Sequence, residues 1–199
     1  FQLPPKKGMV NKMHTLNPNV LKNQIRQIEP YCVTNRLEID SWKSYTGMHV
    51  SPNNIVLDEN PPIQMYLGDR WKVGYDETRY FEAEIAVPAE FEGKKVYLSI
   101  DFGGEAIVRI NGQIVGAVSS EENFGWVHRT EILFKDGVKA GEKLNIQVEG
   151  AVNCAGFCDR AIAGAKYMEY TLNKAELIAV DRLTESYWFD ISTAWDAYE

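Results

Sequence analysis

The fold is decided by the stretch from Arg79 to Ser120, which reads RYFEAEIAVPAEFEGKKVYLSIDFGGEAIVRINGQIVGAVSS. Short segments within it alternate apolar and polar residues, and turn residues separate these segments. Strict alternation sends successive side chains to opposite faces of a strand, so each segment is predicted to bury one face and expose the other. The pattern favours an antiparallel β-sandwich over a nucleotide-binding α/β fold.

Three segments carry the alternation most clearly. Their apolar residues, which we expect to point into one core, are Phe81, Ala83, Ile85 and Val87, then Val96, Leu98, Ile100 and Phe102, and then Leu144, Ile146 and Val148. The dipeptide Asn111-Gly112 separates two further segments. Both of its residues tolerate the positive φ of a type I′ turn, so a tight hairpin is predicted there.

The flanking segments give weaker signals. Asn17 followed by Pro18 is typical of a helix start, with an N-cap and a proline at the first helical position. Proline lacks the amide hydrogen that a further turn needs, so the helix is expected to end at Pro30. Local composition then predicts a helix near 18–29, a strand over 36–43, a long ordered loop over 46–62 and a final strand over 166–181.

Aromatic residues recur at helical spacing near the end of the chain, which predicts a helix there. One interpretation is a terminal helix packed on its own sandwich. The favoured one is a helical linker toward a further, catalytic domain, with a domain interface made by Tyr187, Trp188, Ile191, Trp195 and Tyr198. Without that partner, the aromatic face is expected to be covered by a second copy, giving a homodimer, or by the N-terminal helix.

These signals predict four parts of the chain. Residues 1–8 are interpreted as a tag remnant or a processed natural terminus, and residues 9–35 as an N-terminal helical extension. The β-sandwich domain is expected over 36–182, and the linker over 183–199.

Composition limits the partners. The formal net charge is −7, which argues against a nucleic-acid surface, since phosphate binding needs clustered Lys and Arg. No apolar run approaches the roughly 20 residues of a membrane span. Three cysteines cannot make a disulfide framework, so a cytoplasmic location is the simpler expectation.

Residues for catalysis or metal binding are sparse. The histidines His14, His49 and His128 lie far apart and in no metal-binding spacing. Cys154 and Cys158 would need two further ligands, and the neighbouring sequence supplies none. We therefore predict no catalytic residue, no metal site and no cofactor in this chain, which does not look self-sufficient as an enzyme.

The order of landmarks across the chain resembles a known family. The landmarks are Trp71, Tyr80-Phe81-Glu82-Ala83, Val87-Pro88, Gly93 to Val96, Asp101 to Ala106, Asn111-Gly112 and Lys139 to Glu142. In this order they resemble the N-terminal domain of α-mannosidases of glycoside hydrolase family 38. The closing Lys174–Asp181 segment and the aromatic helix after it are similar to that family's link into the catalytic barrel. The sandwich domains of β-galactosidases and β-glucuronidases share the Ala106–Gly116 pattern and remain the alternative.

The resemblance implies a jelly-roll sandwich, like galactose-binding domains, with a short N-terminal helix and a C-terminal helical segment. The family hydrolyses terminal α-mannosides, and its zinc is held by a His-x-Asp motif and later residues of the catalytic domain. No His-x-Asp occurs in this chain, so none of the family's catalytic residues can be assigned to it. The implied role is a non-catalytic accessory domain that packs on the downstream catalytic domain and helps to shape its cleft or the oligomer.

A carbohydrate-binding role is the second hypothesis, either as a stand-alone module or as the sugar-binding domain of a β-galactosidase-like or β-glucuronidase-like enzyme. Sandwich modules bind sugars with aromatic rings flanked by polar side chains. Two loops carry that chemistry, and their candidate residues are Asp69, Arg70, Trp71, Tyr75 and Asp76, with Asn123 and Trp126. Trp71 is, however, more typical of a core residue at a strand end.

Overall fold

The computed structural model of the 199-residue chain describes residues 18–51, 54–74, 77–120, 129–151 and 167–197. The chain divides into two compact units. One spans Val33–Arg182 and holds the strands, and the other holds the two terminal helices.

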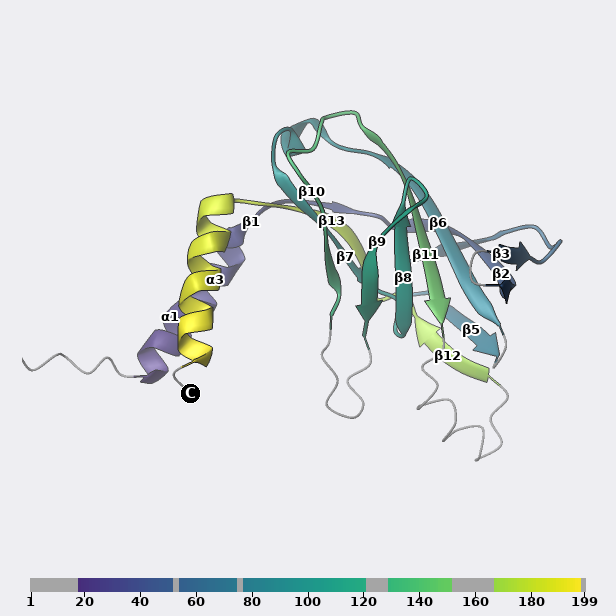
Figure 1. The fold of residues 1–199 in the computed structure, drawn as a ribbon, viewed down its shortest axis with the longest axis horizontal. Coiled ribbons are helices and arrows are strands. Elements are labelled where there is room, and N and C mark those ends of the chain that lie inside the picture. The colour runs from purple at the N-terminus through teal and green to yellow at the C-terminus, as the bar shows by residue number, and fades with distance from the viewer. Residues whose placement is uncertain (1–17, 52–53, 75–76, 121–128, 152–166, 198–199) are drawn as a thin grey trace, which may run out of the picture. The chain divides into compact units, whose positions relative to one another are not determined.

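The Val33–Arg182 unit is built of antiparallel strands (Figure 1). Their bounds are β1 Val33–Glu38, β2 Ser41–Ser51, β3 Asn54–Leu57, β4 Ile63–Tyr66, β5 Arg70–Gly74, β6 Thr78–Ala86, β7 Lys95–Asp101, β8 Glu105–Ile110, β9 Gln113–Ser119, β10 Glu131–Asp136, β11 Lys143–Ala151, β12 Tyr167–Thr171 and β13 Lys174–Val180. A short 3₁₀ turn, Ala89–Phe91, connects β6 to β7.

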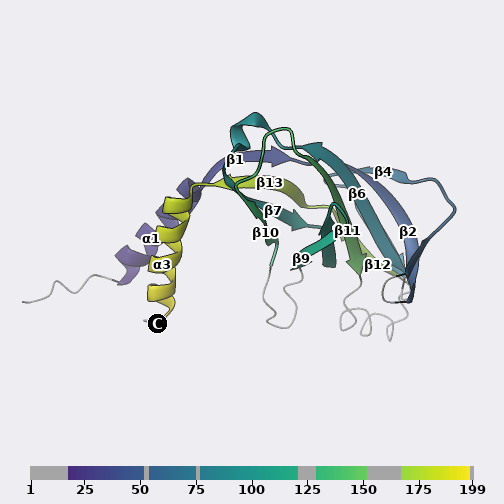
Figure 2. The same cartoon turned by 45° about the horizontal axis from the view of Figure 1, so that its top comes forward.

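The strands form two main sheets and a small third one (Figure 2). The seven-stranded sheet has the order β3-β2-β6-β11-β8-β9, with β4 paired to β2, and the four-stranded sheet has the order β1-β13-β7-β10. β12 and β5 pair separately. The predicted antiparallel jelly-roll sandwich with an N-terminal and a C-terminal helix is confirmed.

The core lies between the sheets, where the predicted apolar sets meet. Phe81 from β6, Leu98 from β7 and Val148 from β11 are all buried, as their alternation predicted. Aromatic rings fill the centre: the ring centroid of Phe102 lies 5.1 Å from that of Trp42 and 4.9 Å from that of Phe81, each pair edge to face. This geometry suits aromatic quadrupoles and adds to the free energy of burial.

The predicted hairpin is confirmed at Asn111-Gly112, which joins β8 to β9. Asn111 has φ 51° and Gly112 has φ 78°, so both central residues are left-handed, as in a type I′ turn. Asn111 also continues the ladder toward β11, because its amide donates to the carbonyl of Asn145 at 2.8 Å and its Oδ1 accepts from the Asn145 amide at 2.9 Å.

The expected strand over 36–43 and loop over 46–62 are wrong. β1 and β2 are separate strands in different sheets, and the chain crosses between them at residues 39–40. β2 and β3 then form a hairpin through much of the expected loop, with Met48 opposite Val56. Hydrogen bonds between β2 and β3 satisfy the backbone groups of this segment. Local composition does not reveal that the two strands pair.

The single final strand expected over 166–181 is also wrong, because the chain changes sheet at Leu172 and Asn173. The Leu172 amide donates to the Asp69 carbonyl at 3.0 Å, and the Asn173 amide donates to the Asp101 carbonyl at 2.9 Å. β12 therefore ends on β5, and β13 begins on β7.

The second unit contains α1, Pro18–Cys32, and α3, Arg182–Asp196, which lie side by side in Figures 1 and 2. The predicted N-terminal helix is confirmed, but its predicted end is wrong. Pro30 lies inside α1, which continues to Cys32. A proline in the last turn removes a single amide donor close to the helix end, where the helix can still complete its final residues.

Candidate functional site

Trp71, the aromatic residue expected to contact a sugar, lies in the core. Its side chain is only 2% exposed, and its Nε1 donates to the Phe102 carbonyl at 2.9 Å. The rings of Phe81 and Tyr170 pack against it, with centroids 5.3 and 4.9 Å away. A ring covered in this way presents no surface on which a sugar could stack. The position of Trp71 fits the core role that is typical of a Trp at a strand end.

Asp69 and Arg70 are exposed at the turn between β4 and β5. The Asp69 carboxylate accepts from the Tyr66 amide at 2.8 Å, which closes the turn. Arg70 lies 3.5 Å from the Glu169 carboxylate on β12, an exposed ion pair of small energetic weight. The remaining loop candidates lie outside the described residues, and they are Tyr75, Asp76, Asn123 and Trp126.

The predicted interface residues on α3 differ in how far they are exposed. Trp195 is 8% exposed, whereas Tyr187 is 57% exposed. Trp188 and Ile191 are half-buried, and Tyr198 lies outside the described residues. The helix is confirmed, and three of its apolar side chains are exposed to solvent: Leu183, Tyr187 and Phe189.

A groove of about 330 Å³ lies on the outer face of the seven-stranded sheet, opposite to the core. Residues that alternate with the core residues of β6, β8 and β11 contribute most of its polar side chains. Those that carry its chemistry are Tyr45, Tyr80, Glu82, Arg109, Gln147 and Glu149. We call this feature the outer-face groove.

The strand register arranges these side chains in two rows. In the first row, Tyr45 lies opposite Tyr80, and Tyr80 lies opposite Glu149. In the second row, Glu82 lies opposite Gln147, which lies opposite Arg109. Directly paired residues have Cβ atoms about 4.5–5.5 Å apart, so the backbone ladder sets the spacing of the groove.

A charge-assisted hydrogen bond connects the two rows. Arg109 Nη1 donates to Glu149 Oε2 at 2.7 Å, and the two side chains are 21% and 7% exposed. Burial, followed by the negative charge of Glu149, raises the pKa of the Tyr80 phenol above its ordinary value, although a hydrogen bond with Thr78 and the charge of Arg109 oppose this. The Tyr80 phenol is therefore uncharged near neutral pH.

Glu82 organises the amides of the second row. Its Oε1 accepts from Asn145 Nδ2 at 2.6 Å and from Gln147 Nε2 at 3.4 Å. These contacts orient both amide groups through one carboxylate oxygen. The outer-face groove thus combines an aromatic row with a row of polar groups held by their neighbours.

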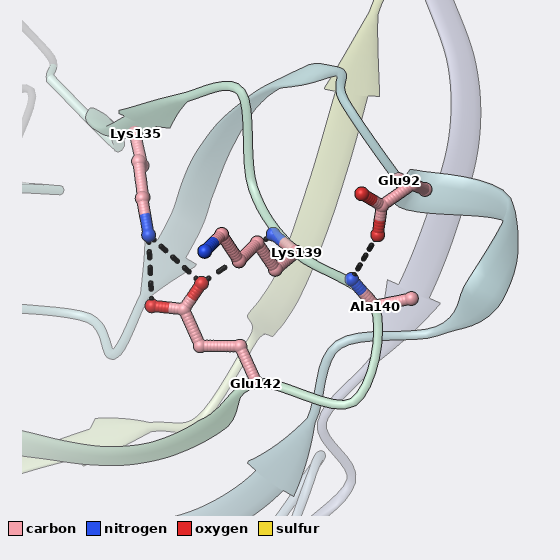
Figure 3. Close-up of polar contacts among 5 residues, drawn as sticks. All are labelled: Glu92, Lys135, Lys139, Ala140 and Glu142. Carbon is pink, nitrogen blue, oxygen red and sulfur yellow. Dashed lines mark hydrogen bonds and ion pairs between the residues drawn. The ribbon is translucent and has the colours of Figure 1, made fainter.

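A second polar cluster ties the turn before β11 to the 3₁₀ turn (Figure 3). Glu142 accepts from Lys135 Nζ at 2.9 Å and from the Lys139 amide at 3.4 Å, while Glu92 accepts from the amide of Ala140. The hydrogen bond from Lys135 lowers the pKa of Glu142, with desolvation opposing it. This cluster stabilises two connections of the sandwich.

The described residues do not fit a metal site. Among them, no group of three or more His, Cys, Asp or Glu side chains could hold an ion. His14, His128, Cys154 and Cys158 lie outside these residues. The zinc that the resemblance implies is held by the catalytic domain of that family.

Sequence reasoning missed the outer-face groove. Alternation with Phe81 and Ala83 places Tyr80 and Glu82 on the outward face of their strand, which by itself does not indicate a site. The available signal was the repeated occurrence of polar and aromatic residues on the outward side of several strands. The strand register, which the sequence does not reveal, places Tyr45, Arg109 and Gln147 beside Tyr80 and Glu82 and so forms the groove.

The two-sheet antiparallel architecture defines the chain as a jelly-roll domain. A family model described as the jelly-roll domain of α-mannosidase matches residues 33–178. This match covers most of the chain, which therefore belongs to the α-mannosidase jelly-roll domain family. The resemblance to the N-terminal domain of an α-mannosidase is confirmed.

Solved structures with a similar fold include glycosidases. A β-glucuronidase from Ruminococcus gnavus in complex with D-glucuronic acid is 14% identical, with a TM-score of 0.50 over 76% of this chain and 31% of that chain. A β-glucuronidase from Faecalibacterium prausnitzii is 14% identical, with a TM-score of 0.47 over 75% of this chain and 32% of that chain. At this identity the likeness concerns the fold alone. The chain spans about a third of the length of these enzymes, and comparison with curated proteins gave no match.

Proposed function

We propose that the chain is the non-catalytic N-terminal accessory domain of a glycosidase that hydrolyses terminal α-mannosides. The observation that carries this proposal is the α-mannosidase jelly-roll match over residues 33–178. The fold likeness to β-glucuronidases, of which the chain spans about a third, supports a place within a larger enzyme. Zinc would then belong to the catalytic domain.

The proposed partner is the downstream catalytic domain of the same polypeptide. Support comes from α3, which follows the last strand closely and exposes Leu183 and Tyr187, one helical turn apart, by 81% and 57%. Apolar side chains exposed together are typical of interaction surfaces. A second copy of the chain, giving a homodimer, is the competing occupant of this helix face.

The location that we propose is cytoplasmic. In the part of the chain that the structure describes, no helix is long and apolar enough to cross a membrane. The content of three cysteines in 199 residues supports a reducing compartment. The net charge of −7 is consistent with a partner other than nucleic acid.

Assay of the purified chain tests the accessory role. We expect no hydrolysis of an aryl α-mannoside and no stoichiometric zinc by metal analysis. A separately produced α-mannosidase catalytic domain, mixed with the chain, should co-elute with it in size-exclusion chromatography. The variant Tyr187→Asp should weaken that complex, and Arg70→Ala, far away in sequence, is the control. Turnover by the chain alone that persists through purification would contradict the proposal.

A further inference from the structure

The outer-face groove has features that packing on a catalytic domain does not require. Its volume of about 330 Å³ lies at the lower end of the range of about 300–1,000 Å³ that is typical of small-molecule sites. One wall is apolar and aromatic, with Ile55 and Leu57 beside Tyr45 and Tyr80. Such sites combine a mainly apolar lining with a few polar groups that fix the ligand's orientation.

Each charged side chain in the groove faces an opposite charge. Arg109 is paired with Glu149 at 2.7 Å, and Lys43 lies directly opposite Glu82 in the strand register. The lining of the groove itself carries one positive side chain, Arg109, and two negative ones, Glu82 and Glu149, so it has no net positive charge that would select an anion. A ligand that fits this groove is therefore expected to be uncharged.

The division into rows matches the shape of a sugar ring. Tyr45 and Tyr80 are the aromatic part of the first row, which ends on Glu149, and Glu82, Gln147 and Arg109 form the polar row beside it. A pyranose also has apolar C–H surface on one side and hydroxyl groups around its rim. The tyrosine rings would supply the apolar surface that this C–H side packs against.

Preorganisation strengthens the match. The groove is built on β2, β6, β8 and β11, whose ladders hold each side chain at a defined register position. The Glu82 carboxylate orients the Gln147 amide, and Glu149 holds the Arg109 guanidinium. Binding would then cost little side-chain ordering, which favours affinity for a small ligand.

We propose that the outer-face groove binds an uncharged saccharide, with the C–H face of a sugar ring against Tyr45 and Tyr80 and its hydroxyls bonded to Glu82, Gln147 and Arg109. This site is distinct from the loops at residues 69–76 and 123–126. It adds a binding activity to the proposed accessory role and stands independently of the α3 interface. A protein segment in the groove is the competing outcome.

Two-dimensional NMR titration of the ¹⁵N-labelled chain tests the proposal. The probes are methyl α-mannoside and an α-linked mannobiose, with D-glucuronic acid as the charged comparator. Saturable shifts are expected for amides of β2, β6 and β11 with the neutral probes. The charged probe should bind no more tightly, because the groove has no net positive charge.

Matched variants locate the site. Tyr45→Ala and Gln147→Ala should each weaken binding about tenfold, which corresponds to about 1.4 kcal/mol. Arg70→Ala, in the loop predicted from sequence, should leave the affinity unchanged. Thermal melting and spectral dispersion establish whether each variant is folded. If Tyr45→Ala does not fold, the affinity of Gln147→Ala tests the groove by itself.

Three results would overturn the proposal. These are the absence of saturable shifts with either neutral probe, binding lost with Arg70→Ala but kept with Gln147→Ala, and tighter binding of D-glucuronic acid than of both neutral probes. Groove shifts caused only by an added catalytic domain or by self-association would also overturn it, in favour of a protein occupant. None of these results affects the hydrolysis assay, so failure of this proposal and failure of the accessory role can be told apart.

Discussion

On β6 and β11, residues that are neighbours in sequence lie on opposite faces of the sheet and differ strongly in burial and in the polarity of their surroundings. Phe81 is 1% exposed inside the aromatic core, while its neighbour Tyr80 lines the outer-face groove. Val148 and Glu149 repeat the contrast on β11. The inner face supplies burial free energy, and the outer face supplies paired polar groups at fixed spacing. Changes on the inner face should therefore lower the free energy of unfolding more than changes on the outer face.

The largest effect should come from the inner face. Phe102→Ala removes the ring that contacts both Trp42 and Phe81, and we expect a loss of about 4 kcal/mol in the free energy of unfolding. Urea denaturation measures this loss. Tyr45→Ala on the outer face is the control, with less than half the effect. Equal losses in the free energy of unfolding would contradict the larger contribution that we assign to the inner face.

The same contrast applies to α3. Trp195→Asp places a charge at a buried position and should cost about 3 kcal/mol, seen as an early loss of helical circular dichroism or as loss of a dimer. Phe189→Asp, at a position 63% exposed, is the matched control and should be nearly silent. If both variants melt like the parent chain, Trp195 does not stabilise the helical unit.

The ion pair is the exception on the outer face, because it is largely buried. Glu149→Ala should cost about 2 kcal/mol, since Arg109 then loses its charged partner. The double variant Arg109→Met/Glu149→Leu should recover most of this loss. A double-mutant cycle by denaturant unfolding measures the coupling, and a coupling energy near zero would mean that the pair is structurally neutral.

At the β8–β9 hairpin, the effect of backbone conformation can be measured without a change in side-chain packing. Gly112→Val should cost about 1 kcal/mol or more, because a β-branched residue resists a φ of 78°. No atom lies within 4 Å of a Cβ built there, so steric contact adds nothing. Gly112→Asn should cost clearly less, since Asn tolerates positive φ. Thermal unfolding that ranks Asn below Val would contradict the type I′ assignment.

The smallest effect is pH-dependent and concerns Glu142. Its pKa is lowered in the folded state by Lys135, so its contribution is present above the unfolded pKa of about 4.3 and is lost as the pH falls through the folded value. The exposed setting limits this to a few tenths of a kcal/mol. Glu142→Gln should thus be slightly less stable than the parent chain at pH 7 and equal to it at pH 2. A difference that grows on acidification would reverse the assigned sign.

Sequence alone determined the local features of this protein. Period-two alternation identified the buried residues of β6, β7 and β11, Asn111-Gly112 marked the hairpin, and Asn17-Pro18 marked the start of α1. Each of these signals depends on a residue and its near neighbours. The landmarks in their order also predicted the family, which the match over residues 33–178 confirms.

Tertiary structure decided which segments meet. The sheet changes at residues 39–40 and 172–173 were not predicted, because the partner strands lie far away in the chain. The outer-face groove depends on the same kind of information. Tyr45 lies opposite Tyr80, and Tyr80 lies opposite Glu149, only because β2, β6 and β11 pair in one particular register. Alternation tells which face a side chain occupies, but the ladder between distant strands decides its neighbours.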